Sequence, residues 1–197
     1  MTDVTAIVLC GGGASRFGAD KLVQALGGTT VLGRLVESLP TSWSIVAVGD
    51  ERPLDRTATW VLEDPPDGGP LAGIAAGIAL VTTELVVVLG GDMPFVGPWA
   101  QRLAAELGDT TDADLAGVCA RGDDGRDNPL LAAYRTAAIR AALPEVTRNG
   151  RARLLLDRLS HHALTVPEAD LLDVDTPAAL ETARARIDPG QAPSGQV

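Results

Sequence analysis

The sequence predicts a single-domain α/β fold with three layers, in which helices cover both faces of a mostly parallel sheet. Three observations lead to this fold class. Strand-like and helix-like segments alternate along the chain, and an internal segment such as 85–89 is continuously apolar, as in strands that are buried on both faces. The length of 197 residues fits one domain with one continuous core. Because we find no internal repeat and no linker, we expect residues 1–188 to form one domain.

In the first half of the chain, each expected element is an apolar run that is bounded by glycine or proline. Gly11 follows the first β-branched run, Pro40 stops the first helix-like stretch, and Gly69-Pro70 opens a helix of small residues, since proline suits the first helical turn. The strands expected here are 4–9, 44–48, 59–62 and 84–89, and the helices are 31–39 and 71–80.

The second half of the chain continues the alternation. The expected helices are 98–107, 136–143, 151–159 and 176–187, and the expected strands are 114–119, 130–134 and 163–166. A polar, glycine-containing loop is expected at 121–127. Residues 189–197 are rich in Pro, Gly, Ser and Gln, so they are expected to be a disordered tail.

Composition excludes several classes of function. A net charge of −10 argues against non-specific binding to nucleic acid, which needs a basic face. The longest apolar run falls far short of the roughly 20 residues of a membrane-spanning helix. The chain starts without the basic segment of a secretory signal, and its two cysteines lie far apart, which favours a reduced, cytoplasmic protein. Of the 16 basic residues, only Lys21 is a lysine.

The glycine-rich stretch from Leu9 to Lys21 reads LCGGGASRFGADK and follows the first expected strand. It is not a dinucleotide fingerprint, because Arg16 stands where the third glycine belongs, and it is not a P-loop, because the lysine comes too late after Gly18. What remains is a backbone cradle for phosphates with two cations, Arg16 and Lys21, which suits a triphosphate. The cradle is expected to consist of Leu9, Cys10, Gly11, Gly12 and Gly13.

Two acidic residues follow strands at the end where parallel sheets bind ligands. Asp92 comes directly after the most apolar strand, and a carboxylate beside glycines suits Mg²⁺, which takes one or two carboxylates together with phosphate oxygens. Asp50 follows the strand 44–48. Its carboxylate could accept hydrogen bonds from N1–H and the exocyclic amine of guanine, or it could be a solvated loop acid.

With these motifs in hand, the sequence resembles the nucleotidyltransferases that include the molybdenum cofactor guanylyltransferases. Its loop is similar to their LxGGxSxRMGxDK signature, with Phe17 in place of methionine and one additional glycine. The resemblance covers roughly residues 4–186. It implies a Rossmann-like nucleotidyltransferase fold, GTP and molybdopterin as substrates, Mg²⁺ on Asp92, and contacts with proteins that insert molybdenum or act as molybdoenzyme chaperones.

The resemblance also assigns roles to three further motifs. Asp64 and the Gly69-Pro70-Leu71 segment resemble the family's acid and GPLAGI motif, which hold the nucleotide, so Asp64, Gly69 and Leu71 are expected nucleotide contacts. Asn128 resembles a residue beside the acceptor pocket. Asp173 and Asp175 stand where the family has the asparagines of NxNTP, the motif that meets the pterin.

The two aspartates leave several interpretations open. Asp175 could be a second metal ligand, or both residues could serve the pterin side with altered hydrogen bonding. Alternatively, Asp175 or Thr176 could simply cap the helix that Pro177 begins. His161 and His162 are expected to be structural, with one side chain pointing inward and the other outward, because neighbours in a strand face opposite ways.

Together with these residues, the resemblance implies transfer of GMP from GTP to the terminal phosphate of molybdopterin, with release of pyrophosphate. Arg16, Lys21 and Asp92 would be the catalytic residues, because phosphoryl transfer depends on positioning and charge neutralisation. The alternatives are cytidylyl or another nucleotidyl transfer, a different phosphorylated acceptor, and a non-catalytic nucleotide-binding protein on the same fold. The last alternative predicts nucleotide binding without turnover.

Overall fold

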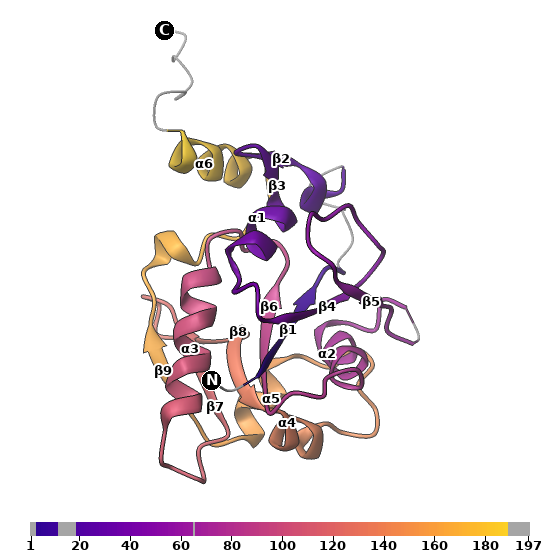
Figure 1. Cartoon of the computed structure of the whole chain (residues 1–197), viewed down its shortest axis with the longest axis vertical. Helices are drawn as coiled ribbons and strands as arrows, with labels where there is room; N and C mark the ends of the chain where they lie inside the picture. Colours follow the sequence, from indigo (N-terminus) through magenta and orange to yellow (C-terminus); the bar gives the residue numbers. More distant parts are fainter. Residues whose placement is uncertain (1–2, 12–18, 65, 189–197) are drawn as a thin grey trace, which may run out of the picture.

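A computed structural model describes residues 3–11, 19–64 and 66–188. Its centre is a seven-stranded sheet in the order β5-β4-β1-β6-β8-β7-β9, in which every strand except β8 runs in the same direction (Figure 1). The strands are β1 (Val4–Leu9), β4 (Ser44–Val48), β5 (Thr59–Val61), β6 (Leu85–Gly90), β7 (Gly117–Arg121), β8 (Asp127–Arg135) and β9 (His161–Thr165). The mostly parallel α/β sheet that the sequence predicts is therefore confirmed.

Helices cover both faces of the sheet. One face carries α1 (Val31–Ser38), α3 (Gly97–Asp109) and α6 (Pro177–Ile187). The other face carries α2 (Pro70–Ile78), α4 (Thr136–Ala142) and α5 (Arg153–Arg158). In Figure 1, α6 lies at one end of the molecule and α4 and α5 lie at the opposite end.

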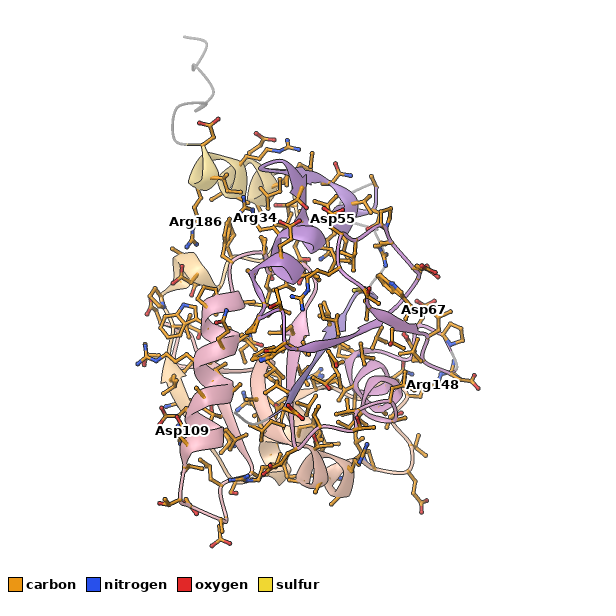
Figure 2. The ribbon with its side chains drawn as sticks, in the orientation of Figure 1. Arg34, Asp55, Asp67, Asp109, Arg148 and Arg186 are labelled. Carbon is orange, nitrogen blue, oxygen red and sulfur yellow. The ribbon has the colours of Figure 1, made fainter. Side chains whose placement is uncertain are left out.

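The central strands are buried because their side chains alternate between two hydrophobic cores. In β1, Ala6 and Val8 face the core under α1 and α3, whereas Ile7 faces the core under α2. The small residues of α2 let this helix lie close to the sheet, since a Cβ on Gly77 would come within 2.9 Å of Ile7. Charged side chains lie at the outside, as Asp109 and Arg148 do in Figure 2.

Backbone hydrogen bonds continue past the carboxyl ends of three central strands and draw the following loops together. Cys10 N–H donates to the carbonyl of Val48 at 2.7 Å, and Gly91 N–H donates to the carbonyl of Leu9 at 2.9 Å. Gly49 has a φ of +137°, and a Cβ there would lie 3.0 Å from the backbone of Cys10. The sequence therefore needs glycine at position 49 to let the loops after β1 and β4 meet.

The structure differs from the sequence-based expectation mainly after β6. β8 is longer than the expected strand 130–134, and it runs antiparallel to both of its neighbours. Arg121 and Asp127, expected in a loop, face each other in the register of β7 and β8, so the loop is only 122–126. A short hairpin of β2 (Ala25–Leu26) and β3 (Thr29–Thr30) was not expected, because two-residue strands have no readable periodicity.

Two short 3₁₀ turns complete the fold, η1 (Lys21–Val23) and η2 (Glu168–Asp170). Within the described ranges, no helix is both long and apolar enough to cross a membrane. The expected tail 189–197 lies outside the described residues.

Candidate active site

A cavity of about 490 Å³ opens where β1, β4 and β6 end, which is the edge at which the sequence places the ligand. Residues from all three loops line it together with the start of η1. The lining includes Leu9, Cys10, Gly11, Asp20, Lys21, Gly49, Asp50, Arg52, Glu63 and Asp92. A larger hollow of about 700 Å³ lies along residues 51–58 and Trp60. Its lining comes from one loop and one strand, so it does not bring together side chains from several strand ends. The converging strand ends therefore mark the candidate site.

Lys21 stands at the centre of the charged groups. Its Nζ donates to Asp92 Oδ2 at 2.5 Å and also to Asp175 Oδ1. The three side chains are partly buried, with 19% of Lys21, 26% of Asp92 and 43% of Asp175 exposed. The ammonium of a residue early in the sequence is thus held by one carboxylate from the middle of the chain and one from near its end. The grouping of Lys21 with Asp92 and Asp175 matches the set of residues that the sequence singles out.

Electrostatics keep this lysine charged. Burial by itself would lower the pKa of Lys21, but hydrogen bonds to Asp175 and Asp92 outweigh burial and raise the pKa above its usual 10.5. Desolvation, together with the negative charges of Asp175 and Asp92, raises the pKa of the nearby Asp173 above 3.8. The cluster therefore has an excess of negative charge that one ammonium does not neutralise.

The segment that carries Asp175 is fixed by two backbone features. Val174 N–H donates to the carbonyl of Asp92 at 2.9 Å, which joins this segment to the loop after β6. Thr176 Oγ1 caps α6 by accepting from the Ala179 N–H at 3.1 Å. Thr176 is therefore the helix cap, and the Asp175 carboxylate is turned to Lys21 instead.

A second hollow of about 340 Å³ adjoins the first and continues toward the start of α2. Glu63, Gly69 and Asp92 line it, whereas Asp64 is exposed and lines neither hollow. The neighbouring Glu63, and not Asp64, therefore lines the cavities. The side chain of Leu71 is buried in the core beneath α2. The expected nucleotide contacts of Asp64 and Leu71 stay predictions.

Asn128 lies farther along the same edge. It lines a shallow hollow of about 420 Å³ with Gly69, Leu130 and Arg151, and its Oδ1 accepts from the Leu130 N–H at 2.9 Å. Gly69 and Leu130 also line the 340 Å³ hollow, so the three hollows form a continuous path from Lys21 to Asn128.

At the other end of the path, the exposed Asp50 lines the first cavity, and its backbone carbonyl accepts from Arg52 at 2.8 Å. Arg52 is a cation that the sequence analysis missed. Its Nε donates to Asp20 Oδ2 at 2.7 Å, which ties the loop after β4 to the start of η1. Arg52 could have been identified from the sequence by its position two residues after Asp50, beyond the carboxyl end of β4.

Cys10 is buried, and burial raises the pKa of its thiol to about 12, so it serves the site through its backbone. Gly11 is described and lines both cavities. Gly12, Gly13 and Arg16 lie outside the described residues, so their expected roles stay predictions.

Comparison with known proteins connects this site to a family. The description "MobA-like NTP transferase domain" matches residues 6–163. The chain belongs to the MobA-like NTP transferase family. It is thus a nucleotidyltransferase, which disfavours the non-catalytic alternative, and nucleotidyltransferases generally use a divalent metal ion.

Two relatives show how far the similarity of this MobA-like transferase extends. A probable molybdenum cofactor guanylyltransferase of Natronomonas pharaonis is 28% identical over 209 residues, covering 95% of this chain and all of the relative. A molybdenum cofactor guanylyltransferase of Cupriavidus metallidurans is 30% identical over 177 residues, covering 85% of this chain and 86% of the relative.

Solved structures agree on the fold. The molybdopterin-guanine dinucleotide biosynthesis protein A of Archaeoglobus fulgidus superposes with a TM-score of 0.69 at 24% identity, over 92% of this chain and 97% of that one. The 2-C-methyl-D-erythritol 4-phosphate cytidylyltransferase of Thermus thermophilus gives 0.68 at 18% identity, over 94% and 98%. The predicted nucleotidyltransferase fold is therefore confirmed.

Proposed function

We propose that this chain transfers GMP from GTP to the terminal phosphate of molybdopterin and releases pyrophosphate. An oxygen of the acceptor phosphate attacks the α-phosphorus, a new P–O bond forms there, and the bond from the α-phosphorus to the bridging oxygen breaks. The named activity of relatives that align over most of this chain supports this choice of substrates. We propose that the acceptor is molybdopterin, either with or without bound molybdenum.

The observation that carries the proposal is the position of Lys21 between Asp92 and Asp175 at the mouth of the cavity. Two carboxylates and one ammonium leave a net charge of about −1, a poor partner for a triphosphate by itself. A divalent cation on the two carboxylates would reverse that sign. Carboxylate oxygens are the ligands that Mg²⁺ takes, so the donor set of Asp92 and Asp175 fits this ion.

Asp92 and Asp175 would hold Mg²⁺, which would supply positive charge against the negative charge of the donor phosphates. The Lys21 ammonium, which lies between these two carboxylates, would also bind the phosphates. Lys21 and Arg16 together would stabilise the leaving pyrophosphate.

The rest of the machinery needs no general base, because the acceptor phosphate is already anionic. Gly11, Gly12 and Gly13 would offer N–H groups to the phosphates. Asp50 would read the guanine base, and Glu63, which lines both cavities where Asp64 does not, would face the ribose side. Asn128 and Asp173 would meet the acceptor at the two ends of the path.

The reaction is tested by an NTP-by-acceptor matrix. Purified protein is incubated with Mg²⁺, molybdopterin and each NTP in turn, and pyrophosphate release is followed. We expect release with GTP and not without molybdopterin. Release with CTP alone would change the nucleotide in the proposal, and no release with any NTP would overturn it.

We place the reaction in the cytoplasm, together with contacts to proteins that supply molybdenum or receive the finished cofactor. The buried, unlinked thiols of Cys10 and Cys119 support a reducing compartment. Fractionation of the native host followed by immunodetection tests the location, and recovery in a membrane or secreted fraction would contradict it.

A further inference from the structure

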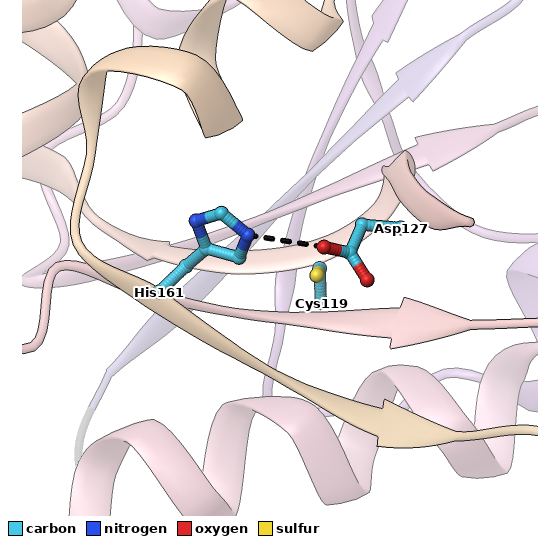
Figure 3. Close-up of side chains that lie close together, drawn as sticks. All are labelled: Cys119, Asp127 and His161. Carbon is cyan, nitrogen blue, oxygen red and sulfur yellow. Dashed lines mark hydrogen bonds and ion pairs between the residues drawn. The ribbon is translucent and has the colours of Figure 1, made fainter. Parts of the chain in front are cut away.

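A cluster of three side chains with different donor atoms lies on neighbouring strands away from the nucleotide cavity (Figure 3). Cys119 lies on β7, Asp127 begins β8 and His161 begins β9. One sulfur, one oxygen and one nitrogen atom of these residues lie within 4.8 Å of one another. Cys119 is fully buried, while 12% of Asp127 and 20% of His161 remain exposed.

Both ring nitrogens of His161 face oxygen atoms that can only accept. Nδ1 lies 3.0 Å from the Leu159 carbonyl oxygen, and Nε2 lies 3.2 Å from Asp127 Oδ2. A neutral imidazole has one N–H, so one of these contacts would place two lone pairs against each other. A cation bound between His161 and Asp127 would remove this conflict.

The sulfur of Cys119 supplies a third donor atom beside this pair, and its thiol donates to the His162 carbonyl at 3.7 Å. We propose that Cys119, Asp127 and His161 form a binding site for a borderline divalent cation of the Zn²⁺ class. Thiolate, imidazole and carboxylate together form the mixed donor set that such ions take. On binding, Cys119 gives up its thiol proton to solvent, and its sulfur forms the bond to the cation.

One of the three donor separations agrees with tetrahedral coordination. With metal–ligand bonds of about 2.0–2.1 Å, a nitrogen and an oxygen on one tetrahedral zinc lie about 3.3 Å apart, and the observed separation is 3.2 Å. Zinc–sulfur bonds of about 2.3 Å would put the sulfur about 3.6 Å from the other donors, whereas the three atoms lie within 4.8 Å of one another. Binding would therefore require the side chains to draw together, and the exposed sides of His161 and Asp127 would admit water as a fourth ligand.

The residues that hydrogen-bond to these three side chains are of the kinds that commonly orient metal ligands. A ligating histidine donates its other N–H to a carbonyl or carboxylate, as Nδ1 of His161 can do to Leu159. Arg121 binds both oxygens of Asp127, with Nε donating to Oδ1 at 2.6 Å and Nη2 donating to Oδ2 at 3.1 Å, and so orients the carboxylate whose Oδ2 also faces His161. This hydrogen bond from Arg121 holds the pKa of Asp127 below 3.8, whereas burial raises that of Cys119 to about 12.

The place of the cluster gives the cation a structural task. β9 pairs in the sheet with β7, and β7 pairs on its other side with β8. A cation bound by all three strands would fasten β9 to the rest of the sheet. Asn128, next to Asp127, lines the shallow hollow of the acceptor path, so the cation would also fix the start of β8 there.

The test uses Co²⁺ as the probe with the full-length protein after treatment with a chelator. With excess Mg²⁺ present to occupy the carboxylates of Asp92 and Asp175, we expect one Co²⁺ per chain, a thiolate-to-cobalt charge-transfer band and the visible bands of tetrahedral cobalt, all removed by Zn²⁺. Calorimetry in buffers of different ionisation enthalpy should show about one proton released per cation. Cys119→Ser and His161→Gln should abolish the thiolate band, and Arg121→Gln should weaken binding by roughly 10- to 100-fold.

Cys10→Ser is the matched control, because it removes the other buried thiol and should leave the cobalt spectrum unchanged. His161 is partly exposed, so His161→Gln gives a folded variant even where Cys119→Ser fails to fold. Absence of the thiolate band, a band that survives His161→Gln, or a band lost in Cys10→Ser would overturn the proposal. So would an NMR spectrum in which His161 carries two ring protons that Zn²⁺ does not displace.

Discussion

The chain holds two clusters of ionisable groups at different places on one sheet, and their donor atoms differ. The cluster at Lys21 consists of carboxylates around an ammonium group, whereas the cluster at Cys119 combines sulfur, nitrogen and one carboxylate. Oxygen donors alone select hard ions such as Mg²⁺, and mixed donors select ions such as Zn²⁺. Under the two proposals above, donor chemistry alone would separate a catalytic from a structural cation within one small domain.

The largest expected effect is that of Asp92→Ala. Loss of this carboxylate should raise the barrier by about 2.7–4 kcal/mol, or lower turnover roughly 100- to 1000-fold, by analogy with removal of one charge-stabilising group. Initial rates of pyrophosphate release measure it. The Co²⁺ spectrum of Asp92→Ala should be that of the wild type. A wild-type rate of pyrophosphate release in Asp92→Ala would contradict the catalytic role proposed for the Lys21 cluster.

Lys21→Arg should have the next largest effect, although it conserves the charge. A forked guanidinium cannot sit between Asp92 and Asp175 as a compact ammonium does, so kcat should fall about tenfold, or about 1.4 kcal/mol. Single-turnover rates at saturating GTP measure it. Arg126→Lys, in the exposed loop 122–126, is the matched control, since Arg126 is 84% exposed. Equal rates for both variants would show that the lysine has no special role.

Asp50→Ala should change selectivity more than rate. Removing one acceptor for the guanine edge should reduce the preference for GTP over CTP by about 0.5–1.5 kcal/mol, roughly two- to tenfold. The ratio of kcat/KM for the two nucleotides measures it. The ratio in Cys119→Ser should be that of the wild type, and an unchanged ratio in Asp50→Ala would make Asp50 a solvated loop acid.

Asp173→Asn should give the smallest effect, and on stability. Because the folded pKa of Asp173 is raised, its favourable contribution is present below the usual value of 3.8 and is lost as pH rises through the folded pKa. The variant should therefore have a slightly higher Tm than the wild type at pH 7, and the same Tm below pH 3.8. Thermal melts at both pH values measure it, and a lower Tm at pH 7 would contradict the sign.

The sequence predicts the frame of this molecule well because continuous apolar strands and glycine or proline boundaries carry strong local signals. It also predicts that Lys21, Asp92 and Asp175 matter, since each stands in a recognisable motif. It fails where a side chain's direction depends on where a strand ends or on the register of a strand pair. Glu63 rather than Asp64 lines the cavity beyond the end of β5, and Arg121 meets Asp127 because β7 and β8 extend past the ends that the sequence predicts.

The cluster of Cys119, Asp127 and His161 shows the same limit more sharply. Its members come from three strands, and the chain order places them far apart, so spacing gives no metal motif. The expectation that the two histidines point opposite ways is confirmed, since His161 faces Asp127 and His162 Nε2 lies 3.8 Å from Glu106 of α3. The alternation of side chains along β9 could predict that the two histidines face opposite ways. Only the register between β7 and β9 brings Cys119 close to His161.

The pairing of Lys21 with Asp175 joins residues that are 154 positions apart. Bringing such distant segments together carries a large loop-closure cost, which only the completed sheet can offset. We therefore expect this pair to form late in folding, after β9 and the start of α6 are in place. Recovery of activity during refolding should coincide with global folding, so a partly folded chain would not consume GTP.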